Sequence, residues 1–192
     1  HGDKVVFKQA YGNKALKPAQ VAMTPDTIFD MASLTKPIAT ATCAMALVEQ
    51  GKLRFSEKVS TYWPEFAANK KEYVTVEHLF IHTTGLPADN HINDYKEGRE
   101  AALKKIANLP LEAPAGTRFR YSDVGFMILG KVIESVSGES LDRFSAEQIF
   151  KPLGMTDTGF LPSEAARVAP TERLGGGMLR GTVHDPRARA LG

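Results

Sequence analysis

The feature that most constrains the fold is a helix that must begin close to Ser33. Residues 34–50 are mostly good helix formers or apolar, and Gly51 supplies the usual stop just after the last turn. Pro37 is tolerated only near the start of a helix, where few backbone N–H groups have an intrahelical partner to lose. The sequence therefore predicts a helix that carries Ser33 and Lys36 in its first turn.

Ser33 and Lys36 are three positions apart, so their side chains share one face of such a helix. The hydroxyl can act as a nucleophile if a neutral lysine takes its proton. We expect burial and the positive end of the helix dipole to lower the pKa of Lys36 for this purpose. The backbone N–H of Ser33 can also face a developing oxyanion. Because S-x-x-K occurs by chance in many helices, other motifs must decide whether it is catalytic.

The composition favours no special class of partner. The chain has 192 residues, of which 43% are hydrophobic and 24% charged, with a net charge of +2. Lysines and arginines are scattered among acids, so we expect no nucleic-acid partner. No apolar run reaches the ~18 residues of a membrane span, so none is expected. Cys43 is the only cysteine, which excludes an internal disulfide and indicates a small core residue.

The rest of the pattern predicts more helix than strand. Because a two-stranded hairpin needs more sheet or a helix face to be stable, we expect this chain to be part of a longer protein whose remaining strands complete the sheet. The expected elements are extended segments at 5–7 and 27–29, helices at 76–81, 97–108 and 140–150, a helix capped by Ser122 or Asp123 and stopped by Gly138, and a long connection from 161 onward.

Tyr121-Ser122-Asp123 forms a second polar cluster, at a corner between an extended segment and a helix. A phenol held near a lysine ammonium can relay protons between a nucleophile and a leaving group. A buried tyrosine followed by a serine that caps the next helix explains the same tripeptide without catalysis.

Four segments are more specific together, in this order, than any one of them alone. They are FDMASLTK at 29–36, EHLFIHTTGLP at 77–87, FRYSDVG at 119–125 and PLGMTDT at 152–158. With these segments, the chain resembles the class C β-lactamase-like serine hydrolases, a family that includes penicillin-binding DD-peptidases and family VIII-type esterases. The resemblance covers nearly the whole chain.

The resemblance implies an α+β fold of the β-lactamase/transpeptidase type, with an antiparallel sheet flanked by helices and a mostly helical lobe. Residues 1–32 would then supply the first strands of the α/β lobe. Residues 33–160 would form the helical lobe with both motifs. Residues 161–192 would form a long connection toward missing C-terminal strands, so the chain would be the N-terminal part of the fold.

The resemblance also implies roles for individual residues. Ser33 would be the acylated nucleophile, Lys36 its amine partner and Tyr121 the proton relay of the Y-x-N motif. Asp123 stands where the family usually has an Asn that binds the substrate's side-chain amide, so we expect Asp123 at the substrate-binding position and weaker β-lactam turnover. The third family motif, K-T-G or H-x-G on a late strand, is not found, so the fragment alone is expected to be a poor catalyst.

The predicted function is that of an acyl-serine hydrolase acting on a small-molecule or peptide-like ester, amide or β-lactam carbonyl, without a metal or organic cofactor. Asp123 favours ester or peptide-like substrates over antibiotics. The alternative is a non-catalytic penicillin-binding or cell-wall-associated protein with the same fold. The expected partner is the remaining C-terminal part of the same protein. Because family members are often exported, an extracytoplasmic location is expected.

Ser122 is a rival to Tyr121 as the proton relay. The S-D-N motif of class A β-lactamases would use the serine of Tyr121-Ser122-Asp123 in this role. Val124 stands at the Asn position of that motif, and the other matching segments favour the class C group, so we expect Tyr121 to be the relay.

Two further sets of residues could in principle carry other chemistry. His78 and His82 could meet a metal from one helix, but Glu77 precedes His78, unlike in H-E-x-x-H, and no third ligand is apparent. The resemblance instead makes 82–85 a structural loop whose imidazole bonds backbone.

A triad of Ser33, His184 and Asp185 is also unfavourable. Adjacent His and Asp side chains seldom orient one another, and Ser33 lies in no G-x-S-x-G elbow. We expect His184 and Asp185 to fix a turn.

Overall fold

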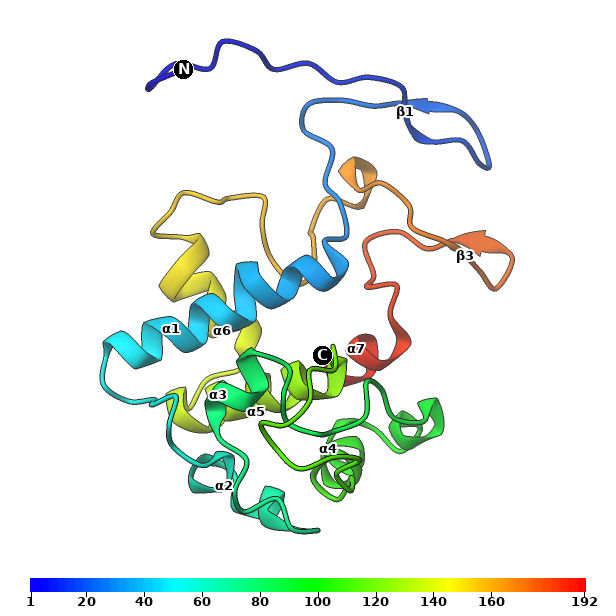
Figure 1. Ribbon diagram of the computed structural model, residues 1–192. Helices are drawn as coiled ribbons and strands as arrows, with labels where there is room; N and C mark the ends of the chain where they lie inside the picture. The colour runs from blue at the N-terminus through cyan, green and yellow to red at the C-terminus, as the bar shows by residue number, and fades with distance from the viewer. The chain divides into compact units, whose positions relative to one another are not determined.

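Helix α5 (Asp123–Ser137) lies at the centre of the hydrophobic core in the computed structural model, which describes residues 1–192 (Figure 1). The Ser122 hydroxyl caps its first turn by accepting a hydrogen bond from the Gly125 N–H at 3.0 Å. Gly138 follows the helix in the left-handed conformation, with φ of 75°. Both ends therefore agree with the sequence prediction. The buried aliphatic positions of α5 repeat at helical spacing: Val124, Ile128, Leu129, Val132 and Ile133.

Other helices of the larger of two structural units, residues 33–156 with 190–192, pack against α5. Burying one aliphatic side chain stabilises a fold by about 1.5–3 kcal/mol, so this cluster is the main source of the unit's stability. The helices around α5 are α1 (Thr42–Glu49), α2 (Val59–Tyr62), α3 (Val76–Phe80), α4 (Arg99–Ala107) and α6 (Leu141–Ser145). Three shorter helical segments accompany them: η3 (Pro64–Ala67) and η4 (Ile92–Tyr95) between these helices, and η5 (Ala146–Phe150) directly after α6.

The predicted helix at Ser33 is present and is built from three consecutive pieces. A tight turn, η1 (Ala32–Leu34), is followed by wide π-type turns, η2 (Lys36–Ala41), and then by α1. From the first residue of α1, the Thr42 hydroxyl donates a hydrogen bond back to the Pro37 carbonyl of η2 at 2.7 Å. Cys43 is buried in α1 as expected, and burial raises the pKa of its thiol to about 12.

The smaller unit combines residues 1–32 with 157–189, two stretches far apart in the sequence. Backbone hydrogen bonds join these stretches, because Ile28 donates to the Arg167 carbonyl at 3.0 Å and its own carbonyl accepts from Ala169 at 2.8 Å. The regular elements of this part of the chain are two antiparallel hairpins and two short helical segments: β1 (Asn13–Ala15) with β2 (Val21–Ala22), β3 (Arg173–Leu174) with β4 (Gly177–Met178), η6 (Ala165–Arg167) and α7 (Pro186–Leu191).

Two sequence expectations about this unit are corrected by the structure. Residues 5–7 form no strand, although their composition favours one, because no other segment pairs with them, and all three side chains are exposed. The hairpin instead uses residues 13–22. The expected connection from 161 onward contains the β3–β4 hairpin and α7, which are too short to give a periodic sequence pattern.

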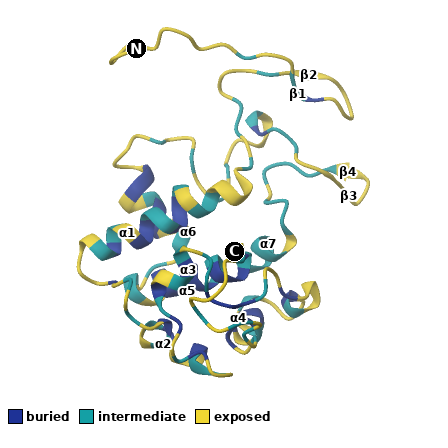
Figure 2. Ribbon diagram, in the orientation of Figure 1, coloured by how far each residue is buried: buried dark blue, intermediate teal, exposed yellow.

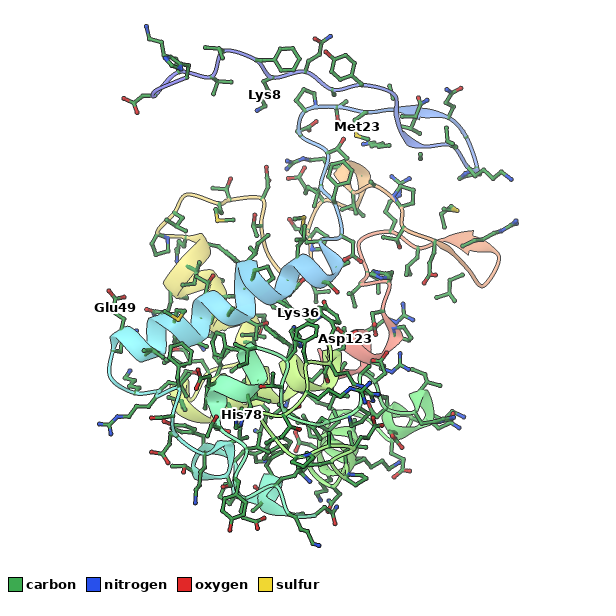
Figure 3. All side chains as sticks on the ribbon, viewed as in Figure 1. Lys8, Met23, Lys36, Glu49, His78 and Asp123 are labelled. Atoms are coloured by element: carbon green, nitrogen blue, oxygen red, sulfur yellow. The ribbon has the colours of Figure 1, made fainter.

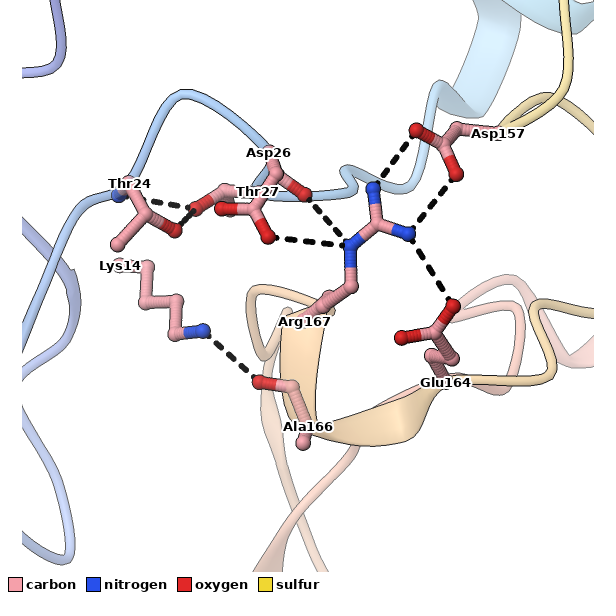
Figure 4. A network of polar contacts seen from close by, with 8 residues as sticks. All are labelled: Lys14, Thr24, Asp26, Thr27, Asp157, Glu164, Ala166 and Arg167. Atoms are coloured by element: carbon pink, nitrogen blue, oxygen red, sulfur yellow. Dashed lines mark hydrogen bonds and ion pairs between the residues drawn. The ribbon is translucent and has the colours of Figure 1, made fainter.

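Arg167 ties the two stretches of the smaller unit together (Figure 4). Its guanidinium donates to both carboxylate oxygens of Asp157, at 2.9 and 2.7 Å, in the paired geometry that only arginine offers. It also donates to the Asp26 carbonyl at 3.1 Å and pairs with Glu164 at 3.3 Å. This network lies directly beside the backbone bonds at Ile28.

Burial is concentrated on the helices of the larger unit, whereas the N-terminal stretch is mostly exposed (Figure 2). Figure 2 shows dark blue on α1, α4 and α5 and yellow along the first residues. None of the helices combines the length and the apolar character needed to cross a lipid bilayer.

Candidate active site

The turn that leads into Ser33 has an unusual backbone. Ala32 has φ of 48°, in the left-handed region that residues with a Cβ rarely adopt. The Asp30 carboxylate supports this conformation, because its Oδ1 accepts a hydrogen bond from the Ala32 N–H at 2.9 Å. Its Oδ2 accepts from the backbone N–H of His184 at 3.0 Å and contacts His184 Nδ1 at 2.9 Å. The Asp30 side chain thus holds the backbone before Ser33 and is itself held by His184.

The predicted contact between Ser33 and Lys36 is present. Lys36 Nζ donates a hydrogen bond to Ser33 Oγ at 3.2 Å. Only 14% of the Lys36 side chain is exposed, so its nitrogen is withdrawn from bulk solvent. The two side chains therefore meet on one face of the first helical turns, as their spacing predicts.

Lys36 also meets two residues of the Tyr121-Ser122-Asp123 cluster. Its ammonium forms an ion pair with the Asp123 carboxylate at the start of α5, and Figure 3 shows these two labelled residues close together. The same nitrogen lies 4.8 Å from the centre of the Tyr121 ring. Segments almost ninety positions apart in the sequence thus bring a hydroxyl, an amine, a phenol and a carboxylate to one place.

The expectation that Lys36 has a lowered pKa is wrong. Burial does act to lower the pKa of Lys36, but hydrogen bonding to Asp123 and Tyr121 and the Asp123 charge outweigh it, so the pKa is raised. Lys36 is consequently an ammonium at neutral pH. The sequence prediction considered burial and the helix dipole and left out the carboxylate that replaces the family's Asn.

Ser122 does not have the geometry of a relay. It is buried, and its hydroxyl both donates to the Pro87 carbonyl at 2.7 Å and accepts from the Gly125 N–H. Tyr121 is 46% exposed, so it is not the buried tyrosine of the alternative explanation. Ser122 is the helix cap, whereas Tyr121 lies in the pocket beside Ser33 and Lys36. The substrate-binding role of Asp123 stays a prediction.

A pocket of about 280 Å³ opens at these side chains. Its wall combines the polar groups of Ser33, Lys36 and Tyr121 with apolar side chains. The lining residues are Ser33, Lys36, Pro37, Ala41, Phe80, His82, Tyr121 and Phe126. The predicted nucleophile, amine and phenol therefore share one space large enough for a small acyl group.

His82 is a polar pocket residue that sequence reasoning did not connect with the site. The prediction that its imidazole bonds backbone is confirmed, since Nδ1 accepts a hydrogen bond from the Ser122 N–H at 3.1 Å. Its position in the wall beside Tyr121 was not predicted. The sequence signal that could have placed His82 near Tyr121 is that both residues lie in segments that carry the family resemblance.

The rival metal site is not formed by the two histidines. His78 Nδ1 accepts from the Thr75 N–H at 3.1 Å in a capping box at the start of α3, and His82 is used at Ser122. No group of three His, Cys, Asp or Glu side chains in the chain has the arrangement of a metal site.

The rival triad is not formed either. His184 pairs with Asp30, and Asp185 caps α7 through the Arg187 and Ala188 N–H groups at 2.7 and 3.1 Å. His184 and Asp185 therefore have separate structural partners, just before and at the start of α7.

The beta-lactamase family model matches residues 1–190. Among curated proteins, the chain is 32% identical to the Escherichia coli (strain K12) protein named "Putative D-alanyl-D-alanine carboxypeptidase", over 97% of this chain and 48% of that one. It is 30% identical to the N-acetylmuramyl-L-alanine amidase of Bacillus subtilis (strain 168), over 96% of this chain and 50% of the amidase. The chain thus spans about half the length of these relatives.

Solved structures agree with the sequence match. A family VIII carboxylesterase superposes with a TM-score of 0.73 and 29% identity, over 84% of this chain and 45% of the esterase. The predicted resemblance and the predicted α+β, β-lactamase/transpeptidase-like fold are confirmed. With its matched length, its fold and its shared segments, the chain belongs to the β-lactamase family.

Proposed function

We propose that the chain carries the acylation machinery of a serine hydrolase in which Ser33 attacks the carbonyl carbon of an ester or amide. The observation that carries this proposal is the 3.2 Å hydrogen bond from Lys36 Nζ to Ser33 Oγ, in a pocket that Tyr121 also lines. Because the chain spans about half the length of its curated relatives, the activity is proposed for the natural full-length protein.

Tyr121 is the proposed proton carrier, because Lys36 is already protonated. In the proposed step Tyr121 acts as a phenolate: Ser33 Oγ forms a bond to the carbonyl carbon, the carbonyl π electrons move to its oxygen, and the hydroxyl proton goes to the phenolate oxygen of Tyr121, which becomes a neutral phenol. The Lys36 ammonium donates to Ser33 Oγ, and its charge favours the negative oxygen that accepts this proton. Such general acid–base catalysis contributes about 10²–10⁴-fold in rate.

The acyl group is then released in two steps. As the tetrahedral intermediate collapses, Tyr121 gives its proton to the leaving alkoxide or amine, and Ser33 remains acylated. Water next attacks the acyl carbon and loses a proton to Tyr121, which returns it to Ser33 as the acyl–oxygen bond breaks. The enzyme is thereby restored, and one water molecule has been consumed.

The proposed substrates are esters or peptide-like amides ahead of β-lactams. The named relatives include a carboxylesterase and an amidase, so both bond types occur among similar proteins. A carboxylate at position 123 has no N–H to offer a lactam side chain, and here it is also paired with Lys36. The proposed preference for esters and amides over β-lactams therefore follows from Asp123, which stands where the family usually has Asn.

The decisive experiment incubates the full-length protein with a fluorescent penicillin and with a short-chain nitrophenyl ester, and compares Ser33→Ala. We expect ester turnover and covalent labelling of the parent protein, and loss of both in Ser33→Ala. Ser163→Ala is the matched control, because Ser163 is exposed and lies outside the pocket.

Each result separates the candidate functions. Rapid ester turnover that depends on Ser33 supports the hydrolase. A stable label on Ser33 without turnover would identify a penicillin-binding protein instead. Absence of both label and turnover in the parent protein would favour the non-catalytic alternative and overturn the proposal.

A further inference from the structure

We infer that His82 is the positioning residue of Tyr121, holding the phenol in place through the backbone on both of its sides; this inference rests on the proposed function. His82 belongs to the loop after α3, about forty positions before Tyr121, and touches neither Ser33 nor a leaving group in the proposed chemistry. Its effect on catalysis would therefore act through Tyr121.

The backbone contacts of His82 bracket Tyr121. The His82 carbonyl accepts a hydrogen bond from the Arg120 N–H at 2.8 Å. Its Nδ1 accepts one from the Ser122 N–H at 3.1 Å. One residue thus satisfies the donors immediately before and immediately after Tyr121. This arrangement fixes where the phenol leaves the main chain.

The imidazole ring also packs directly on the phenol. The ring centres of His82 and Tyr121 lie 4.6 Å apart with an angle of 32° between the planes, and the Phe126 ring lies 5.0 Å away on the same imidazole. His82 itself has φ of 56°, a left-handed conformation that His, Asn and Asp adopt more readily than other residues with a Cβ. Ring contact and backbone contact together restrict Tyr121 far more than a hydrogen bond alone.

The arrangement works only with a neutral imidazole, because protonated Nδ1 would point an N–H at the Ser122 N–H. The charged groups that face His82 are the Lys36 ammonium from η2, which opposes protonation, and the Asp123 carboxylate from α5, which favours it. The Tyr121 and Phe126 rings cover the imidazole. Burial and Lys36 outweigh Asp123, so the pKa of His82 lies below its usual value.

The test compares two replacements that both tolerate the left-handed backbone. His82→Asn keeps an acceptor, Oδ1, at the place of Nδ1, whereas His82→Gly removes it without strain. We expect His82→Gly to lower kcat by about 100-fold with little change in KM, because displacing a catalytic group by about 1 Å costs that much. His82→Asn should keep kcat within about tenfold and lose the acidic limb that His82 titration imposes on the parent.

His91→Asn is the matched control. Like His82, His91 uses its Nδ1 to accept a hydrogen bond from a backbone N–H, here that of Asn93 at 3.2 Å. Unlike His82, His91 is exposed and lies outside the pocket. This variant should keep parental kcat, KM and pH profile. Equal kcat values for His82→Gly and His82→Asn would overturn the inference, whether both are high or both are low.

A second measurement separates this inference from the proposed function. Amide hydrogen exchange of Arg120 and Ser122 reports on their hydrogen bonds to His82 without any substrate. We expect exchange at Ser122 to become faster in His82→Gly but not in His82→Asn, including in a protein that shows no turnover. If the parent protein is inactive but shows this exchange pattern, the proposed hydrolase function is contradicted and the positioning of Tyr121 by His82 is supported. Unchanged exchange at Ser122 in a folded His82→Gly variant would defeat the positioning.

Discussion

A single carboxylate sets the charge of the amine at the candidate site. Asp123 begins α5 and pairs with Lys36, whose pKa is raised although its side chain is largely buried. An amide at position 123 could still accept a hydrogen bond, but it would remove the negative charge. The carboxylate at position 123 therefore favours the ammonium form of Lys36.

Replacing Asp123 by Asn tests this point through the pH dependence of the reaction. Without the carboxylate, only Tyr121 opposes the effect of burial, so the pKa of Lys36 falls. If Lys36 acts as an ammonium, the basic limb of the kcat profile moves to lower pH. Ester hydrolysis by the full-length protein between neutral and alkaline pH measures it. A shift confined to the acidic limb would mean that neutral Lys36 is the base, which contradicts the proposed chemistry.

At the scale of elements, the N-terminus of α5 joins the core to the site. Ser122 caps the helix, Tyr121 precedes the cap and Asp123 is the first helical residue, so one helix start positions two predicted site residues. The cap was predictable, because Ser before an apolar helical pattern is a strong local signal. The pairing of Asp123 with Lys36 was not, because it depends on how η2 and α5 pack in three dimensions.

Ser122→Ala should destabilise the protein by about 2 kcal/mol, since the helix loses its cap and the Pro87 carbonyl loses a buried donor. Urea unfolding followed by circular dichroism measures this difference. The exposed Ser163→Ala serves as the control and should stay within about 0.5 kcal/mol of the parent. A Ser122→Ala protein as stable as its parent would show that the cap contributes nothing to α5.

At the scale of the whole molecule, the smaller unit depends on contacts between two distant stretches of chain. Charged side chains supply two of them, the contacts of Arg167 with Asp26 and the His184–Asp30 pair. Local sequence patterns predicted the helices that correspond to α1, α3, α4, α5 and α6, because 3.6-residue periodicity is a local property. They did not predict α2, whose four residues are too few for a periodic pattern. They failed for residues 5–7, because a strand requires a partner that local composition does not specify.

Replacing Arg167 by Lys should loosen the junction of the two stretches. Lysine keeps the charge but cannot engage both oxygens of Asp157 and the Asp26 carbonyl in one plane. We expect several-fold faster amide exchange at Ile28 and Ala169, whose backbone bonds lie beside the network. Exchange at α5 is the internal control and should not change. Equal exchange rates of the Ile28 amide in both proteins would mean that the backbone hydrogen bonds alone hold the two stretches together.

The His184–Asp30 pair should weaken as pH rises. Hydrogen bonding to Asp30 raises the pKa of His184 against the effect of burial, so the folded protein binds a proton there more tightly than the unfolded chain. Its stabilising effect is fully present below about pH 6.5 and is lost as pH rises through the raised pKa. Thermal unfolding at several pH values should show this loss, and His184→Asn should remove it. An identical pH dependence in both proteins would exclude His184 as its source.

The wide turns of η2 decide where the amine of Lys36 lies. Lys36 and α1 lie at opposite ends of this segment, so the winding of residues 36–41 sets the azimuth of the amine relative to the core face of the helix. Rewinding the same six residues to ordinary α geometry would swing Lys36 around the axis by about one residue's rotation, ~100°. The ammonium would leave Asp123, so exchanges in this segment should be tolerated only where they keep the wide winding.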